Sequence, residues 1–165
     1  MKKPFLRFLS IVVCCLFMAT TGFAQPANDN CAGAIPITPS PAGTGCGTAQ
    51  FTLPFTSDGT TDSGVATTSC SPPGLDQWFT WTATAPSLFF ESSVPGDPGI
   101  AIFDNCADAA TGNEISCLNT FGSGTLSGWN VGDNLIIQIF DFDASFADVG
   151  FCLEIGAPPP ANNLC

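Results

Sequence analysis

The chain has 165 residues, enough for one domain of ordinary size. Only 10% of the residues are charged, against a usual quarter, and 45% are hydrophobic. The three basic residues, Lys2, Lys3 and Arg7, all lie near the N-terminus, and histidine is absent. Nucleic-acid binding is excluded because the chain beyond these residues has no cationic side chain to displace phosphate counterions. Ser-His-Asp, Cys-His and lysine chemistry are excluded because the base is missing.

Residues 1–24 have the features of a secretory signal peptide. A positively charged N-terminal region is followed by an apolar stretch at residues 11–19 and by small residues before Gln25. The apolar stretch is short for a membrane span. We therefore expect cleavage before Gln25, which leaves an exported chain with no membrane span and a formal charge of −14 from its fourteen acidic residues. A retained anchor, or acylation of Cys14 or Cys15, is the alternative.

The cysteines of the exported part are predicted to form disulfide bonds. Export places them in an oxidising compartment, where cysteines pair with one another. A zinc site is not favoured because even Cys106 and Cys117, the nearest pair, are eleven residues apart and no histidine is available. The seven cysteines concerned are Cys31, Cys46, Cys70, Cys106, Cys117, Cys152 and Cys165.

Short segments rich in aromatic and β-branched residues recur along the chain, separated by Gly, Pro, Asn and Asp. Strands are predicted at 51–56, 76–84, 87–94, 100–104, 125–129, 133–142 and 149–155. No apolar stripe with helical period runs beyond two turns. This pattern predicts an all-β fold, an antiparallel β-sandwich with a jelly-roll-like arrangement.

The segment 133–142 is the strongest predicted strand. Ile136 and Phe140 lie on one face of it, and Ile137 and Ile139 lie on the other. Because both faces are mostly apolar, we expect a central strand that is covered on both sides.

A short repeat marks the end of the domain. The sequence PANDNC at residues 26–31 returns as PANNLC at residues 160–165, directly after a run of prolines. We therefore expect one β-sandwich module at residues 25–157. Residues 158–165 then form a proline-rich linker and the start of an incomplete second repeat.

Several segments resemble a known family of bacterial modules. They are ANDNCAGAIPI at 27–37, DQWFTW at 76–81, IAIFDNC at 100–106, VGDNLIIQI at 131–139 and GFCLEI at 150–155. Together they resemble repeat modules of secreted and surface proteins from Bacteroidetes-type bacteria, close to the pre-peptidase C-terminal (PPC-like) domain family. The resemblance covers residues 26–156. It implies a β-sandwich repeat, secreted or held at the cell surface of a Gram-negative, Bacteroidetes-like bacterium and attached to adhesin-like chains or enzymes.

The same resemblance implies a disulfide pattern in which six cysteines pair and Cys165 is left over. Six cysteines allow fifteen connectivities. The pairing expected from the resemblance is Cys31–Cys152, Cys46–Cys70 and Cys106–Cys117.

Acidic residues gather at two places that could bind calcium. Ca²⁺ takes oxygen ligands from Asp, Asn and backbone carbonyls. The alternative is that these acids are solvated and keep the chain soluble. No cofactor is required in either case. The candidate ligands are Asn28, Asp29 and Asn30 at the start of the domain, and Asp141, Asp143 and Asp148 near its end.

Aromatic residues offer a candidate platform for sugars. Trp129 lies in a stretch rich in Gly and Ser, and Phe121 precedes it. If both rings were exposed, they could stack on a carbohydrate. The alternative is that they belong to the core, as expected for Trp78 and Trp81.

These observations predict a non-catalytic extracellular module for adhesion, ligand binding or accessory use, with a glycan or a surface protein as its partner. A structural spacer without a ligand is the first alternative. A carboxylate-dependent glycosidase is a remote one, because it needs two carboxyl groups about 5 to 9 Å apart in one cleft. The glutamates Glu91, Glu114 and Glu154 are its candidates.

Overall fold

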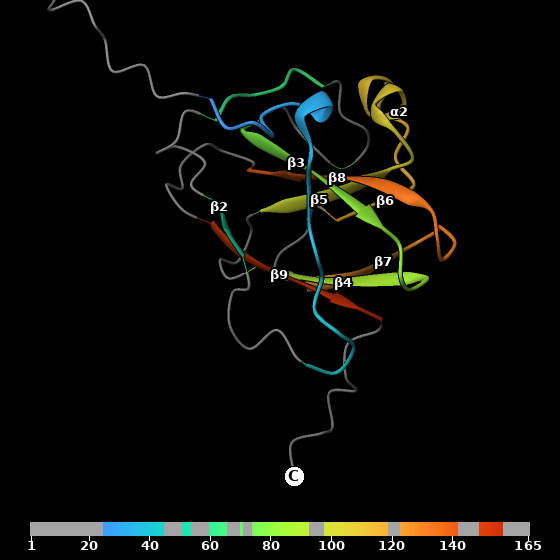
Figure 1. The fold of residues 1–165 in the computed structure, drawn as a ribbon. Helices are drawn as coiled ribbons and strands as arrows, with labels where there is room; N and C mark the ends of the chain where they lie inside the picture. The colour runs from blue at the N-terminus through green and yellow to red at the C-terminus, as the bar shows by residue number, and fades with distance from the viewer. Residues whose placement is uncertain are drawn as a thin grey trace, which may run out of the picture.

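A computed structural model shows the chain as two β-sheets packed face to face (Figure 1). This architecture confirms the predicted all-β sandwich. The structure describes residues 25–44, 51–53, 60–65, 70, 74–92, 98–118, 123–141 and 149–156. The expected signal peptide and the expected start of a second repeat lie outside these residues. No helix in the described ranges is long and apolar enough to cross a membrane.

The first sheet has five strands in the order β1-β3-β8-β5-β6. Only β1 runs parallel to its neighbour, and the other pairs are antiparallel. Its strands are β1 (Ile35–Pro36), β3 (Asp76–Thr82), β5 (Gly99–Phe103), β6 (Ser116–Leu118) and β8 (Asn134–Phe140).

The second sheet has four antiparallel strands in the order β2-β9-β4-β7. Each predicted strand is therefore present, and the boundaries of β3, β5, β7 and β8 differ from the prediction by one or two residues. The predicted strand ends at residues 56 and 94 lie outside the described residues. The strands of this sheet are β2 (Phe51–Leu53), β4 (Ser87–Ser92), β7 (Ser123–Ser127) and β9 (Val149–Ile155).

Strand β8 lies in the middle of the five-stranded sheet, as predicted. It pairs with β3 along all seven of its residues, Asn134–Phe140, and with β5 on its other side. Ile137 and Ile139 are fully buried between the two sheets, and Phe140 is buried on the opposite face.

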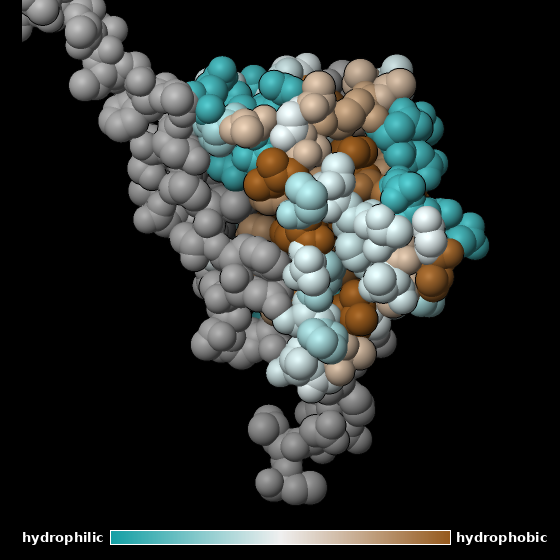
Figure 2. Space-filling view, viewed as in Figure 1, coloured by the Kyte–Doolittle hydropathy of each residue, from teal (hydrophilic) through white to brown (hydrophobic). Residues whose placement is uncertain are grey.

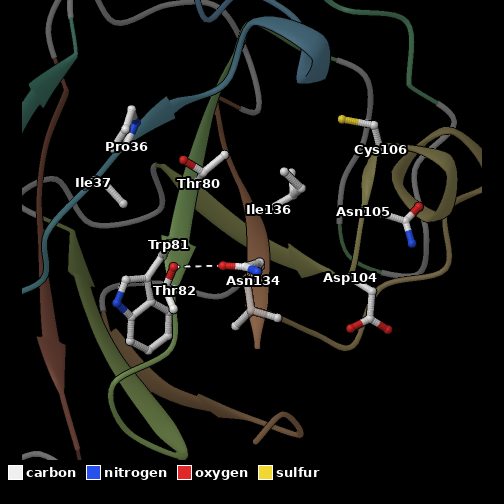
Figure 3. A pocket seen from close by; sticks show the side chains of 11 residues that line it. Pro36, Ile37, Thr80, Trp81, Thr82, Asp104, Asn105, Cys106, Asn134 and Ile136 are labelled. Carbon is white, nitrogen blue, oxygen red and sulfur yellow. Dashed lines mark hydrogen bonds between the residues drawn. The ribbon is translucent and has the colours of Figure 1, made fainter. Parts of the chain in front are cut away.

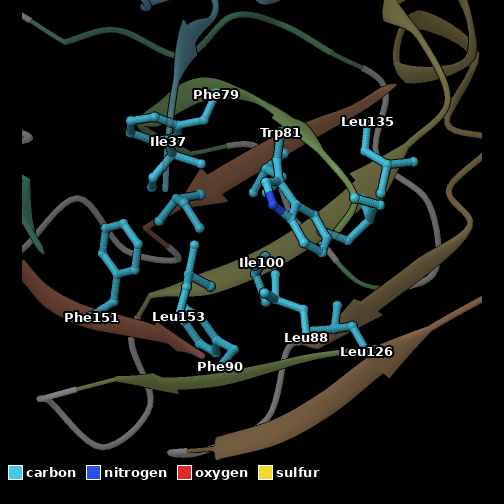
Figure 4. Packing of buried hydrophobic residues seen from close by; sticks show 14 of the residues in the cluster. Ile37, Phe79, Trp81, Leu88, Phe90, Ile100, Leu126, Leu135, Phe151 and Leu153 are labelled. Carbon is cyan, nitrogen blue, oxygen red and sulfur yellow. The ribbon is translucent and has the colours of Figure 1, made fainter. Parts of the chain in front are cut away.

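The main core fills the space between the sheets (Figure 4). Strand β3 contributes Phe79 and Trp81 to it, because alternate residues of a strand face the same side. The facing sheet contributes Leu88, Phe90 and Phe151, and the Phe90 and Phe151 rings pack with centroids 6.2 Å apart.

A second, smaller core lies on the outer face of the five-stranded sheet, beneath the 3-10 helix η1 (Cys31–Gly33) and the helix α2 (Cys106–Thr111). Both helices lie over that face in Figure 1. Its buried residues are Trp78, Ala101, Phe103, Ala109 and Phe140.

Helix α2 was not predicted, although its capping residues can be read in the sequence. Asn105 is the N-cap, and its Oδ1 accepts hydrogen bonds from the N–H groups of Ala107 and Asp108 at 2.8 and 3.0 Å. Gly112 ends the helix with a φ of +69°, which favours glycine. A helix of six residues is too short to show an apolar period.

Two disulfide bonds join η1 to α2 and residue 70 to β6. Cys31 pairs with Cys106, and Cys70 pairs with Cys117. Cys152 is also disulfide-bonded. The pairing implied by the family resemblance is therefore wrong at Cys31–Cys152, Cys46–Cys70 and Cys106–Cys117. Cys106 and Cys117 are only eleven residues apart, but η1 lies beside α2 and places Cys31 next to Cys106.

Candidate ligand-binding groove

A groove of about 600 Å³ opens on the outer face of the five-stranded sheet, beside η1 and α2 (Figure 3). One of its walls is β1 and the residue after it, Pro36 and Ile37. The opposite wall is residues 104–106, which are the two residues after β5 and the first residue of α2. We call this feature the outer groove.

The floor of the outer groove comes from strands β3 and β8. Thr80, Thr82, Asn134 and Ile136 alternate onto this face, because the register pairs Thr80 with Ile136 and Thr82 with Asn134. Thr82 Oγ1 donates to Asn134 Oδ1 at 2.8 Å across the two strands. Thr82 and Asn134 are exposed, whereas Thr80 and Ile136 are half-buried. The floor therefore combines hydroxyl and amide groups with one apolar side chain.

The wall formed by α2 is fixed covalently. Cys106 lines the groove, and its disulfide bond to Cys31 ties η1 to α2. Asn105 is held in place because its side chain caps the helix and its Nδ2 donates to Asp108 Oδ2 at 2.5 Å. Asp104, just before this cap, is exposed at the rim. This wall of the groove is thus held by a disulfide bond and by the hydrogen bonds of the helix cap.

The surface around the outer groove is mixed in polarity. Figure 2, viewed as in Figure 1, shows hydrophilic side chains at the upper left and along the right of this face, pale to light brown ones over the helices at its top, and separate hydrophobic ones between paler residues in its middle. Within the described residues, the exposed large hydrophobic side chains are Ile35, at 41% exposed, and Val131, at 62%. The first of these belongs to β1, next to the groove.

A buried polar network, separate from the groove, connects the domain start to β3. Asp29 is 4% exposed and accepts hydrogen bonds from Thr61 N, Thr61 Oγ1 and Gln25 Nε2, each at 2.6 Å. Asn28 Nδ2 donates to Gln77 Oε1 at 3.3 Å. These bonds join the segments 25–30 and 60–65 to the sheet.

Asp76 belongs to the same buried region. Its carboxylate accepts from Ser63 Oγ at 2.5 Å, Gln138 Nε2 at 2.7 Å and Trp78 Nε1 at 3.2 Å. Burial raises the pKa of Asp76 to about 6, against the lowering effect of these hydrogen bonds. Asp76 is 2% exposed and does not line the outer groove.

The structure uses the first candidate calcium cluster for internal hydrogen bonds. Asp29 is held by three protein donors, and Asn30 Oδ1 accepts from Gly33 N at the start of η1. Asp141, from the second cluster, is fully buried at the end of β8, and Asp143 and Asp148 lie outside the described residues. No group of three or more His, Cys, Asp or Glu residues with metal-site geometry is found in the described ranges.

Trp129 is not a surface platform, which corrects the expectation from sequence. Its side chain is 6% exposed and packs edge-on against Trp81 with ring centroids 5.8 Å apart. Its Nε1 donates to the Ala85 carbonyl at 2.9 Å, which satisfies the one polar group of the ring. Phe121 lies outside the described residues. The surrounding Gly and Ser residues suggested exposure, but the ring turns into the core between the sheets.

The three glutamates considered for catalysis lie on separate elements. Glu91 is half-buried on β4, and Glu114 is half-buried between α2 and β6. Glu154 is fully buried on β9, where it accepts a hydrogen bond from Gly43 N. Among the residues that line the outer groove, Asp104 alone carries a carboxylate.

No family model, curated protein or solved structure matches this chain.

The outer groove was not predicted from the sequence. The alternation in β3 places Thr80 and Thr82 on one face, which was a usable signal. Their partners on β8 and the wall at residues 104–106 depend on strand register and on the Cys31–Cys106 bond, which no short sequence pattern shows.

Proposed function

We propose that the chain is a non-catalytic extracellular module that binds a ligand in the outer groove. The observation that carries this proposal is the Cys31–Cys106 bond at the groove wall. A disulfide that ties η1 to α2 holds the wall in one geometry, and a preformed site loses less entropy when a ligand binds. The module would serve as an adhesion or accessory repeat with a glycan or surface protein as its partner.

The disulfide bonds also support the extracellular setting. Bonds of this kind persist in oxidising compartments. Together with the N-terminal signal-like segment they favour secretion or display on a cell surface, and the PPC-like resemblance favours a Gram-negative, Bacteroidetes-like bacterium.

The residue types in the groove favour binding over catalysis. The chain has no histidine, and its lysines and its arginine all lie within the first seven residues. Glycoside hydrolysis needs a second carboxyl group near the first, and Asp104 has none beside it in the groove lining. Threonine hydroxyls and asparagine amides form hydrogen bonds with a ligand but are poor proton-transfer groups near neutral pH.

A fragment screen by NMR tests the proposal without assuming a ligand. Fragments added to the ¹⁵N-labelled, oxidised chain should shift the amide signals of Thr82, Asn105 and Ile136 at the groove. Signals of Thr125 on the opposite sheet should not move, and they serve as the internal control. If no fragment shifts the groove signals, or if all fragments act elsewhere, the binding proposal is wrong.

The structural spacer remains a second candidate because of one observation. Trp78, Trp81 and Trp129 are all buried, so none of the tryptophans offers an exposed ring to a ligand. A failed fragment screen would favour this candidate, in which the acidic surface maintains solubility.

A further inference from the structure

We propose that the outer groove takes an uncharged, hydroxyl-rich ligand, namely a neutral oligosaccharide segment. This inference deepens the proposed function and rests on it. It comes from four properties of the groove: its hydrogen-bonding groups, its apolar patches, the charge around it and its size.

The polar groups of the groove match hydroxyl groups. A hydroxyl both donates and accepts a hydrogen bond. Asn134 Oδ1 is occupied by Thr82, which orients the amide and leaves its Nδ2 group to donate to a ligand. The hydroxyls of Thr80 and Thr82 can accept, and the Asp104 carboxylate at the rim accepts from ligand hydroxyls. Donors and acceptors thus lie on two strands and on the facing wall.

The apolar groups of the groove match the C–H face of a sugar ring. Pro36 lies on the β1 wall, and the Ile136 side chain is half-buried in the floor. Together with Cys106 they provide surface for C–H groups. An amphiphilic lining of this kind suits a ligand that carries hydroxyls and hydrocarbon faces on one ring.

The charge of the chain selects against anionic ligands. Every side chain after Arg7 is neutral or acidic, and Asp104 is in the groove lining itself. An anionic ligand such as a uronic-acid polymer would meet repulsion with no cation to offset it. A cationic amino sugar would be attracted by Asp104. However, Asp104 is the one charged group in the groove lining, and the other polar groups there are neutral and match neutral hydroxyls. The observations therefore favour a neutral ligand.

The size of the groove suits more than one sugar ring. A volume of about 600 Å³ lies within the usual range of 300 to 1,000 Å³ for ligand sites. The groove lies on the outer surface of the sheet, so a chain could continue beyond its ends. This geometry favours a segment within an oligosaccharide.

Calorimetry with three sets of oligosaccharides tests the inference. The oxidised chain is titrated with neutral hexamers (cello-, manno-, xylo- and laminari-hexaose), with oligogalacturonate and with chitosan oligomers. At least one neutral hexamer is expected to bind. The variants Thr82→Ala and Asn134→Ala should each weaken that binding by about tenfold, because each removes a groove hydrogen-bonding group.

Matched controls separate the groove from general effects. Thr125→Ala removes an exposed strand threonine from β7, on the other sheet, and should leave the affinity unchanged. Asp104→Asn gives a second groove variant outside the strands, useful if a strand variant fails to fold, and should weaken binding several-fold.

Three results would overturn the inference. They are binding of oligogalacturonate or chitosan with no neutral hexamer bound, binding that the groove variants leave unchanged, and no binding of any oligosaccharide. If fragments still shift the groove signals in the last case, the binding function stands and only the ligand class is wrong. If they do not, the proposed function fails as well.

Discussion

Buried carboxylates set the chemistry of this molecule at the level of single residues. Asp29, Asp76 and Asp141 are each at most 4% exposed, and every basic residue lies within the first seven positions. A buried carboxylate must then be stabilised by hydrogen bonds or carry a proton. The Asp29 carboxylate accepts hydrogen bonds from three donors. The Asp76 carboxylate also accepts hydrogen bonds, and in addition its pKa is raised.

The raised pKa of Asp76 predicts that stability falls as pH rises through the acid range. The folded-state pKa is about 6 against an ordinary value of 3.8, so the folded chain binds the proton more tightly than the unfolded chain. The free energy of unfolding should therefore decrease between pH 4 and pH 6, with a contribution from this residue on the order of 3 kcal/mol. Urea unfolding across this range measures it.

Asp76→Asn provides the control for this prediction. The other acids titrate in both proteins, so the difference between the two pH curves isolates Asp76. The variant should lose the decrease between pH 4 and pH 6. Two curves with the same slope would show that Asp76 does not titrate in this range.

Asp29→Ala should destabilise the fold, because the carboxylate organises residues 25–30 and 60–65. Its removal leaves the donors of Thr61 and Gln25 without their acceptor, and we expect a loss of about 2 to 4 kcal/mol. Asp62→Ala, at an exposed position, should cost less than about 1 kcal/mol. Thermal melts in Ca²⁺ and in EDTA should show the same loss. A loss seen only in Ca²⁺ would instead make Asp29 a calcium ligand.

At the level of elements, the sequence predicted long strands well and short elements poorly. Strands β3 and β8 carry seven residues each, with alternating aromatic or aliphatic side chains, and such patterns are visible in a single sequence. The two residues of β1, with a proline, and the three of β6 are too short for any period. They exist because longer neighbouring strands offer them backbone partners.

Close packing of β5 against β8 predicts a large effect at one glycine. Gly99 lies opposite Phe140, and a Cβ at residue 99 would come within 2.2 Å of the Phe140 ring. Gly99→Ala should therefore lower the free energy of unfolding by about 2 kcal/mol. In a Phe140→Leu background the cost should fall by at least half. An equal cost in both backgrounds would mean that the ring does not pack on this glycine.

Removal of the bond between η1 and α2 should affect stability and the groove together. Cys31 and Cys106 are 75 residues apart, and a loop of this length predicts a stabilisation of about 4 kcal/mol. The double variant Cys31→Ser/Cys106→Ser should melt at a lower temperature, and the NMR signals of Asn105 at the groove should shift. Signals of Thr125 on the opposite sheet give the control. Unchanged Asn105 signals would show that the bond does not hold the wall.

At the level of the whole molecule, composition and strand spacing predicted the sandwich. They did not predict the order of the strands within the sheets. A central strand covered on both faces follows from the apolar residues on both sides of β8. The outer groove depends on which strands are neighbours, and the sheet order β1-β3-β8-β5-β6 joins segments from both ends of the chain. Contacts of such high sequence separation leave no local pattern, which is also why the disulfide pairing was predicted wrongly.

Disulfide mapping of the oxidised chain tests this arrangement most directly. Trypsin has no site after Arg7, but cleavage at Asp and Glu separates Cys106 from Cys117, since Asp108 and Glu114 lie between them. Cys31 and Cys46 stay together on the peptide 30–58, so fragmentation of the linked peptide must assign which of the two is bonded. Mass spectrometry of the unreduced peptides should find Cys31 linked to Cys106 and Cys70 linked to Cys117. A peptide that links Cys106 to Cys117 would contradict the contact between η1 and α2 and, with it, the wall of the outer groove.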